Sequence, residues 1–412
     1  MKRGLFVVIL ASTLVAIVVS GARGASQTSG AAARWFTAWG TSQQTVSTAA
    51  VSNTTLRLIA RVTIGGDAVR LRLDNFHGKS AVKIGRAFVG VRARGPLVVS
   101  GSNKAVLFNG SEAATIPAGG SVRSDPIVMN VLAMQDLAVS LYIPDADVLA
   151  SQHTGALATS YVATANAGDH AAVEGGDPFT ATLTTMPLLK AIDVSSRTAP
   201  GAIVAFGDSI TDGTCSTLDA HDRWVDWLSV RLGLDSARRD AHKAVVNEGI
   251  GGNTLTSEGL QPPPDSTPGL ERLERDVLSH AGVTDVILFM GTNDIRRGAS
   301  AAQVIDAMTR IAAAIKSRRM KVFGATIIPR HNVPPSGTNT GWNDAKTAIR
   351  REVNQWMRTR APFDGVLDFD AAVRDPSNGD LINAPFNCDG IHPTPRGYFE
   401  MGKMLRLDLF VR

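Results

Sequence analysis

The sequence has little of what marks a nucleic-acid-binding protein. Its 42 Lys and Arg residues against 37 Asp and Glu residues leave a formal net charge of only +5 over 412 residues. Lys2 and Arg3 fall in an amino-terminal leader, so a chain without that leader carries about +3. Basic runs and basic residues interleaved with aromatic ones are missing as well. We therefore expect no nucleic-acid partner.

Histidine is scarce, and its spacing does not fit a metal site. His77, His153 and His170 of the amino-terminal half are scattered without ligand spacing, so we expect them on the surface or in loops. Four further histidines have no aspartate at a useful spacing and are predicted to be structural or to lie at a rim: His221, His242, His280 and His331. The sequence therefore predicts no metal ligands among these histidines.

The first residues have the pattern of a secretory signal peptide. Two basic residues are followed by an uncharged apolar run over 4–19 and by small residues over 20–22. An uncleaved membrane anchor is the alternative, because the run is close to the shortest length that spans a bilayer. We predict a cleaved signal peptide over 1–22, a disordered leader over 23–33, and a secreted or periplasmic protein without stable membrane association.

Residues 34–194 alternate between apolar and polar side chains with a period of two. Leu56, Leu58, Ala60 and Val62 alternate with neighbours that are polar except for Ile59. Gly65 and Gly66 then mark a turn, and a second alternating run follows from Val69. This pattern predicts a hairpin. Many short strands without helical stretches predict an all-β sandwich of jelly-roll type, with a linker over 195–200.

Residues 201–412 alternate strands with helices. The predicted strands are 202–206, 244–246, 285–290, 322–328 and 365–369, and the predicted helices are 221–232, 270–278, 301–315, 345–357 and 397–407. Crossover helices between successive strands predict a parallel sheet in a three-layer α/β/α domain, flavodoxin-like in strand order. Long loops over 254–268 and 329–343 are expected to form the rim of a cleft.

A serine follows the first of these strands. The apolar run Ala202–Phe206 suits a strand buried on both faces, and Gly207-Asp208-Ser209 ends it. A hydroxyl at the carboxyl end of a parallel strand points into the crevice where such sheets bind ligands, which favours a nucleophile. The alternative is an ordinary strand-to-helix turn with Asp208 or Ser209 as the helix cap.

Two further segments end at the same edge of the predicted sheet. In 247–253 glycines would let a carbonyl oxygen approach a backbone N–H, or they would simply make a turn. In Gly291-Thr292-Asn293-Asp294 the asparagine amide is a neutral donor that stabilises an oxyanion, or it caps the next helix.

An Asp-x-x-His segment precedes the last predicted helix. Asp389 and His392 stand three apart in one tight turn, so the carboxylate can fix one imidazole nitrogen as a donor. The other nitrogen is then free to accept the serine proton. The alternative is an Asp-Gly turn beside a helix cap.

These four segments, in this order, make residues 200–412 resemble the SGNH/GDSL hydrolases, including secreted bacterial members with a β-sandwich domain. The resemblance implies Ser209 as the nucleophile and His392 as the general base, oriented by Asp389. It also implies Ser209, Gly252 and Asn293 as the oxyanion hole. The choice of Gly252 over Gly249 or Gly251 stays open. The resemblance also implies esterase, lipase or acetyl-esterase activity without a metal or cofactor.

The sequence departs from the family name in one place, since Ile210 stands where leucine is expected. The Gly-x-Ser-x-Gly elbow of the α/β-hydrolases is absent around Ser209, which argues against that larger family. Cys215 lies six residues after Ser209, and Cys388 lies four before His392. If the serine and histidine touch, the two sulfurs come close together, so we predict a disulfide between them.

The resulting hypothesis is a secreted serine esterase acting on a small-molecule or polysaccharide ester, with short acyl, acetyl and acetylated-carbohydrate esters favoured. Asp208, Asp212, Arg223 and Asp294 lie beside the site and are expected to cap and hold loops. Three alternatives stay open: a lysophospholipase or lipase, an acyltransferase, and a carbohydrate-binding protein whose hydrolase domain is inert. The sequence does not choose the acyl chain or the alcohol.

Overall fold

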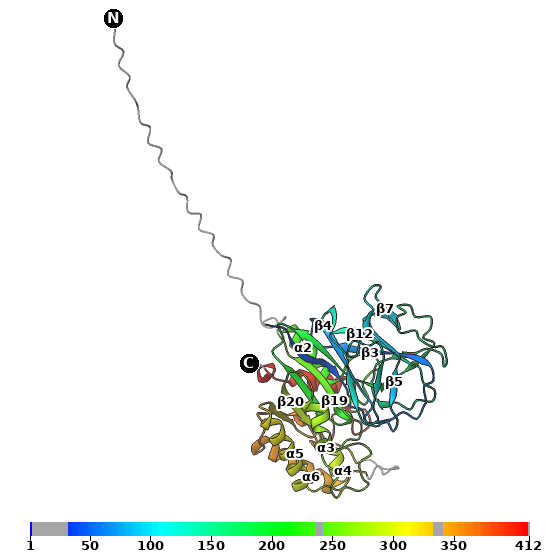
Figure 1. Ribbon diagram of the computed structural model, residues 1–412. Helices are drawn as coiled ribbons and strands as arrows, with labels where there is room; N and C mark the ends of the chain where they lie inside the picture. Colours follow the sequence, from blue (N-terminus) through cyan, green and yellow to red (C-terminus); the bar gives the residue numbers. More distant parts are fainter. Residues whose placement is uncertain (2–31, 236–241, 333–340, 411–412) are drawn as a thin grey trace. The chain divides into compact units, whose positions relative to one another are not determined.

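The computed structural model describes residues 1, 32–235, 242–332 and 341–410 (Figure 1). The predicted signal peptide apart from residue 1 and the predicted leader apart from its last two residues lie outside the described residues, as do residues 333–340 of the predicted loop over 329–343. Among the described residues, no helix combines the length and the apolar character that crossing a bilayer requires. Residues 33–412 form one compact unit, so both halves of the sequence are described together.

A parallel sheet organises the carboxy-terminal region. Among the described residues its strand order is β19-β18-β20-β21-β22, and all four pairings are parallel. The bounds of these strands are β18 Ala202–Gly207, β19 Ala244–Gly249, β20 Val283–Phe289, β21 Lys321–Ala325 and β22 Gly365–Leu367. The first strand in sequence is therefore an interior strand, and the strands on both sides of it end at the same edge.

Helices cover both faces of this sheet. Alternate residues of β18 divide between two cores: Val204 and Phe206 pack with α5 and α6, whereas Ile203 and Ala205 pack with α2 and α8. The alternation follows from the strand period of two and gives three layers. The helices are α1 Ser209–Asp212, α2 Trp224–Leu234, α3 Gly269–Leu273, η1 Glu274–Leu278, α4 Thr292–Arg296, α5 Ala301–Ser317, α6 Asp344–Thr359, α7 Phe369–Val373, η2 Ala384–Phe386, α8 Pro395–Met404 and η3 Leu407–Phe410.

The amino-terminal region, which runs from blue through cyan into green in Figure 1, is built of antiparallel strands. Among its described residues, the first sheet contains β1 Arg34–Gly40, β17 Leu189–Ser196, β4 Gly66–Asp74, β10 Ser121–Arg123 and β11 Ile127–Val131. The second sheet contains β15 Ala181–Leu183, β14 Ser160–Val162, β3 Thr54–Val62, β12 Gln135–Ile143, β6 Arg86–Arg94, β7 Leu97–Val98 and β8 Lys104–Val106. Smaller pairings join β2 Thr45–Val46, β13 Ser151–His153 and β16 Met186–Pro187, and join β5 Val82–Ile84 with β9 Ala114–Ile116. The jelly-roll and flavodoxin-like assignments remain predictions.

The predicted hairpin around Gly65 is wrong. Both of its strands exist, but β3 pairs with β12 and β14, whereas β4 pairs with β17, β10 and β11. The turn carries the chain from one sheet to the other, and the apolar faces of both strands meet in a shared core that includes Leu58 and Leu71. Alternation specifies the buried face of a strand but not its partner, so the pattern could not distinguish the two arrangements.

The two regions are joined by a buried ionic network. Lys190 from β17 lies 2.7 Å from Glu248 of β19 and 2.9 Å from Asp276, and all three side chains are fully buried. Ser42 donates to Glu248 over 2.5 Å, and Arg272 donates to Ser42 over 2.8 Å. Removing one partner of such a network leaves an uncompensated buried charge, at a cost of about 3–5 kcal/mol.

Candidate active site

Ser209 begins helix α1 immediately after β18. Asp208 precedes the helix, and its carboxylate accepts the N–H of Ile210 over 3.0 Å. A side chain at Gly207 would meet Thr211 Oγ1 at 2.0 Å, so only glycine lets the chain turn this tightly into the helix. The strand end therefore fixes the Ser209 hydroxyl at the carboxyl edge of the sheet.

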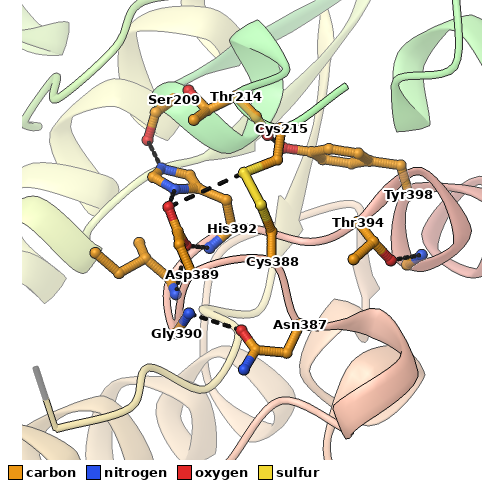
Figure 2. The surroundings of a disulfide bond; sticks show 12 residues. Ser209, Thr214, Cys215, Asn387, Cys388, Asp389, Gly390, His392, Thr394 and Tyr398 are labelled. Carbon is orange, nitrogen blue, oxygen red and sulfur yellow. Dashed lines mark hydrogen bonds and ion pairs between the residues drawn. A yellow bond between two sulfur atoms is a disulfide. The ribbon is translucent and has the colours of Figure 1, made fainter. Parts of the chain in front are cut away.

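His392 lies in hydrogen-bond contact with Ser209, as Figure 2 shows. Its Nε2 is 2.9 Å from Ser209 Oγ, and its Nδ1 is 2.7 Å from Asp389 Oδ2. Because a carboxylate only accepts, Nδ1 is the donor, and a neutral ring then presents its Nε2 lone pair to the serine hydroxyl. The three side chains thus form a continuous path for the serine proton.

The Asp389 carboxylate is held ionised by its own turn. Partial burial alone would raise its pKa, but hydrogen bonds from the His392 ring and from the backbone N–H groups of Ile391 and His392 outweigh that effect. The net result is a pKa of Asp389 well below its usual range. The residue therefore stays an acceptor throughout the neutral pH range.

A disulfide joins Cys215 to Cys388, as predicted from their positions. Their Cα atoms are 6.5 Å apart, and the bond ties the loop after α1 to the residue before Asp389 (Figure 2). Tyr398 of α8 adds a second tie, because its hydroxyl donates to the carbonyl of Thr214 over 2.6 Å. The segments that carry the serine and the histidine are thus linked covalently and by hydrogen bonds.

The three candidate glycines of the loop after β19 differ in whether a hydrogen bond occupies the backbone N–H. Within the described residues, hydrogen bonds occupy the N–H groups of Gly249, Ile250, Gly251 and Asn253, whose acceptors are Asn247 Oδ1, Gly207 O, Asp212 Oδ2 and Ile250 O. The N–H of Gly252 forms no hydrogen bond to any described residue. Gly252 has φ +72°, and a side chain there would meet nothing within 4 Å, so the residue faces open space. Of the three candidate glycines, Gly252 is the one whose N–H is available.

Asn293 lies beside this loop. It sits in α4 after β20, it is buried, and its Nδ2 donates to the carbonyl of Asn253 over 3.0 Å. An amide nitrogen carries two hydrogens, so the second one remains for another acceptor. The structure thus brings Asn293 to the residue that follows Gly252.

The neighbouring aspartates hold loops, as expected. Asp294 accepts the N–H groups of Leu255 and Thr256 at 2.9–3.2 Å. Burial raises the pKa of Asp208 and that of Asp294 to about 7, although backbone N–H groups oppose the rise at both sites. Arg223, also expected to support the site, donates to the carbonyl of Ala156 in the amino-terminal region over 2.6 Å.

His153 overturns one prediction. It is buried rather than in a loop or at the surface, and it ends strand β13 of the amino-terminal region. Its Nε2 lies 3.0 Å from Asp212 Oδ1, and its Nδ1 lies 2.8 Å from the carbonyl oxygen of Ser42. Asp212 closes helix α1, three residues after Ser209. Nothing in the sequence near His153 indicates this contact, because the two residues are 59 positions apart.

Comparison with known proteins places the carboxy-terminal region in a family. The GDSL-like Lipase/Acylhydrolase family matches residues 205–398. No curated protein sequence matches the chain significantly. The matched residues contain the serine, the loop of Gly252, Asn293, Asp389 and His392.

Solved structures that resemble this chain cover about half of it. An aryl esterase from M. smegmatis has 20% sequence identity and a TM-score of 0.39, covering 49% of this chain and 95% of its own. A carbohydrate acetylesterase from Sinorhizobium meliloti has 18% identity and a TM-score of 0.36, covering 49% and 94%. A member of the lipolytic protein G-D-S-L family from Veillonella parvula has 21% identity and a TM-score of 0.36, covering 51% and 98%. The family match over 205–398 identifies a GDSL-like lipase/acylhydrolase domain in the carboxy-terminal region of the chain.

Proposed function

We propose that Ser209 is the nucleophile of an esterase, that His392 is its general base, and that Asp389 orients the imidazole ring of His392. The observation that carries the proposal is the uninterrupted contact of 2.9 Å from Ser209 Oγ to His392 Nε2 and of 2.7 Å from His392 Nδ1 to Asp389. His392 takes the serine proton as the hydroxyl attacks the ester carbonyl, and then returns it to the leaving alcohol. A water molecule then attacks the acyl-enzyme, with His392 again taking the proton and returning it to Ser209, and the acid is released.

The oxyanion of the tetrahedral intermediate is proposed to bind three donors. These are the N–H groups of Ser209 and Gly252 and the side-chain amide of Asn293. The free N–H of Gly252 and the remaining amide hydrogen of Asn293 support this assignment over Gly249 and Gly251, whose N–H groups are already occupied. A donor of this kind contributes about 10²–10³ in rate.

The favoured substrates are short acyl or acetyl esters, including those of carbohydrates. An open groove of about 600 Å³ is lined by Ser266 and Thr267, which accept hydrogen bonds from Asn253, the residue after Gly252. Its other walls carry hydroxyl, amide, imidazole and carboxylate side chains together with Val46 and three prolines. Such a surface suits a hydroxylated alcohol better than a long hydrocarbon chain. The disulfide supports action outside the cytoplasm.

A substrate panel with a nucleophile variant tests the proposal. The purified protein is assayed on p-nitrophenyl esters of increasing acyl length and on acetylated sugars, with and without an added acceptor alcohol. We expect the highest kcat/KM on the shortest acyl groups and acetylated sugars, and a loss of at least about 10³-fold in Ser209→Ala with an unchanged Tm. Near-normal turnover by Ser209→Ala contradicts the nucleophile, and a preference for long acyl chains contradicts the substrate class.

A further inference from the structure

We propose that His153 of the amino-terminal region is a positioning residue of the esterase: as an imidazolium it holds Asp212, and through Asp212 the oxyanion loop. This inference rests on the proposed function, because it assigns a role relative to Ser209 and Gly252. It gives the β-rich region a role in catalysis.

The first step is the charge of His153, which its two contacts determine. Nδ1 faces the carbonyl oxygen of Ser42 at 2.8 Å, and Nε2 faces a carboxylate oxygen of Asp212 at 3.0 Å. Both partners are acceptors, so both ring nitrogens must donate, and a ring with two N–H groups is positively charged. The direction of the pKa agrees: burial opposes the charge, but Asp212 outweighs burial, and the pKa of His153 is raised.

The second step runs from Asp212 to the oxyanion loop. One carboxylate oxygen of Asp212 accepts from His153, and the other accepts the N–H of Gly251 over 3.1 Å. Gly251 directly precedes Gly252, whose free N–H is the proposed donor. Asp212 also belongs to the helix that Ser209 begins. One carboxylate therefore fixes the nucleophile helix and the donor loop relative to each other, and His153 fixes that carboxylate.

The third step concerns electrostatics. A bare carboxylate bonded to the peptide next to the oxyanion donor would repel the negative charge that develops in the transition state. The imidazolium of His153 neutralises this carboxylate within a buried, weakly screened environment. The pair thus orients the donor loop without imposing a net negative charge beside it.

Other charged groups border the same place, and none of them replaces His153. A cavity of about 60 Å³ between the two regions is lined by His153 and Asp212 together with Arg61, His221, Arg223 and Asp226. Arg223 faces His153 and disfavours its charge, whereas Asp212 and, to a smaller extent, the carbonyl of Ser42 favour it. Burial lowers the pKa of His221, so that ring titrates at lower pH than His153.

The test compares His153→Gln with His170→Gln, a matched control at a half-buried histidine of the same region. Glutamine keeps a donor toward Asp212 but loses the positive charge and the bond to Ser42. We expect His153→Gln to lower kcat by about 10–100-fold with KM changed less than about twofold, because the donor loop acts on the transition state. His170→Gln should retain wild-type kcat.

The pH profile separates positioning from mere structural support. Because the pKa of His153 is raised, its charged form persists to a higher pH than that of an ordinary histidine and is lost as the pH rises through that raised value. We expect the wild type and His170→Gln to lose kcat along this alkaline limb, and we expect the limb to be missing in His153→Gln. If His153→Gln does not fold, Asp212→Asn decides, because its neutral amide can bond His153 and Gly251 without charge and should also lack the limb.

The outcomes separate this inference from the proposed function. A wild-type kcat and pH profile in His153→Gln, while Ser209→Ala is inactive, overturns the positioning role and leaves the proposed function standing. Retention of the alkaline limb in Asp212→Asn overturns it equally. An inactive wild type or an active Ser209→Ala contradicts the proposed function itself.

Discussion

Two histidine–aspartate pairs flank the helix that Ser209 begins, and their surroundings give them different chemistry. In the first pair the side chains of His392 and Asp389 are 13% and 42% exposed and stand three residues apart. In the second, those of His153 and Asp212 are 3% and 11% exposed and come from the two regions of the molecule. The same residue types therefore serve one local, open site and one buried junction.

The difference lies in what each ring faces on its far side. His392 faces a serine hydroxyl, which can give up a proton, so its ring can act as a base. His153 faces a backbone carbonyl, which can only accept, so its ring keeps both protons. A histidine beside an aspartate is thus a base or a fixed cation according to its third partner.

The largest expected effect comes from neutralising Asp389, and neutralising Asp212 should cost far less. Asp389→Asn would present an amide N–H₂ to His392 Nδ1, which favours the tautomer that carries its proton on Nε2 and cannot accept from Ser209. We expect kcat to fall about 10³–10⁴-fold. Asp212→Asn can keep both of its hydrogen bonds in neutral form, so we expect a loss within about tenfold at neutral pH. Steady-state kinetics on a short-chain ester measures both, and equal losses would show that the pairs do not differ as described.

A smaller effect on turnover is expected from the disulfide, which restrains only the first pair. Replacing Cys215 and Cys388 by serine removes the covalent tie between the two loops but leaves the second pair buried. We expect the free energy of unfolding to fall by about 2–5 kcal/mol, with kcat reduced less than about tenfold. Urea unfolding and ester kinetics on the double variant check both values, and wild-type stability would contradict the role of the tie.

The smallest expected effect is on the pH dependence of stability, where the two pairs act on opposite sides. The lowered pKa of Asp389 gives stability that is present above the ordinary carboxyl value and lost as the pH falls toward the lowered one. The raised pKa of His153 gives stability that is present below the ordinary histidine value and lost as the pH rises through the raised one. Unfolding free energies measured across the pH range should flatten on the acid side in Asp389→Asn and on the alkaline side in His153→Gln. A wild-type slope in either variant would contradict its assignment.

The sequence predicted the features of the fold and candidate site that depend on local pattern. The apolar run before Ser209 and the spacing of Asp389 and His392 lie within single segments, and parallel strands bring their carboxyl ends to one edge. The structure accordingly places Ser209, Asp389 and His392 in contact. The disulfide could be predicted for the same reason, because both cysteines lie within a few residues of the contact between Ser209 and His392.

The contacts that the sequence could not predict are those between distant segments. The hairpin at Gly65 failed because strand alternation does not name a partner. The role of His153 was missed because its contact with Asp212 depends on how the amino-terminal strands pack against β19 and α1. No local sequence spacing indicates that packing. Choosing Gly252 likewise required knowing which N–H groups of the turn were already bonded.

The buried ionic network limits how this protein can be truncated. Its members are Lys190, Glu248, Asp276, Arg272 and Ser42. A fragment that starts near residue 200 would lack Lys190 and Ser42. Asp276 would keep its contacts with Arg272 and Arg275, and Glu248 its contact with His280, but both carboxylates would lose the lysine that bridges them and would be exposed to water. The segment that the family matches therefore depends on contacts with the amino-terminal region and should be less stable without it. Swapping its β-rich partner for that of another esterase would require exchanging both halves of the junction together.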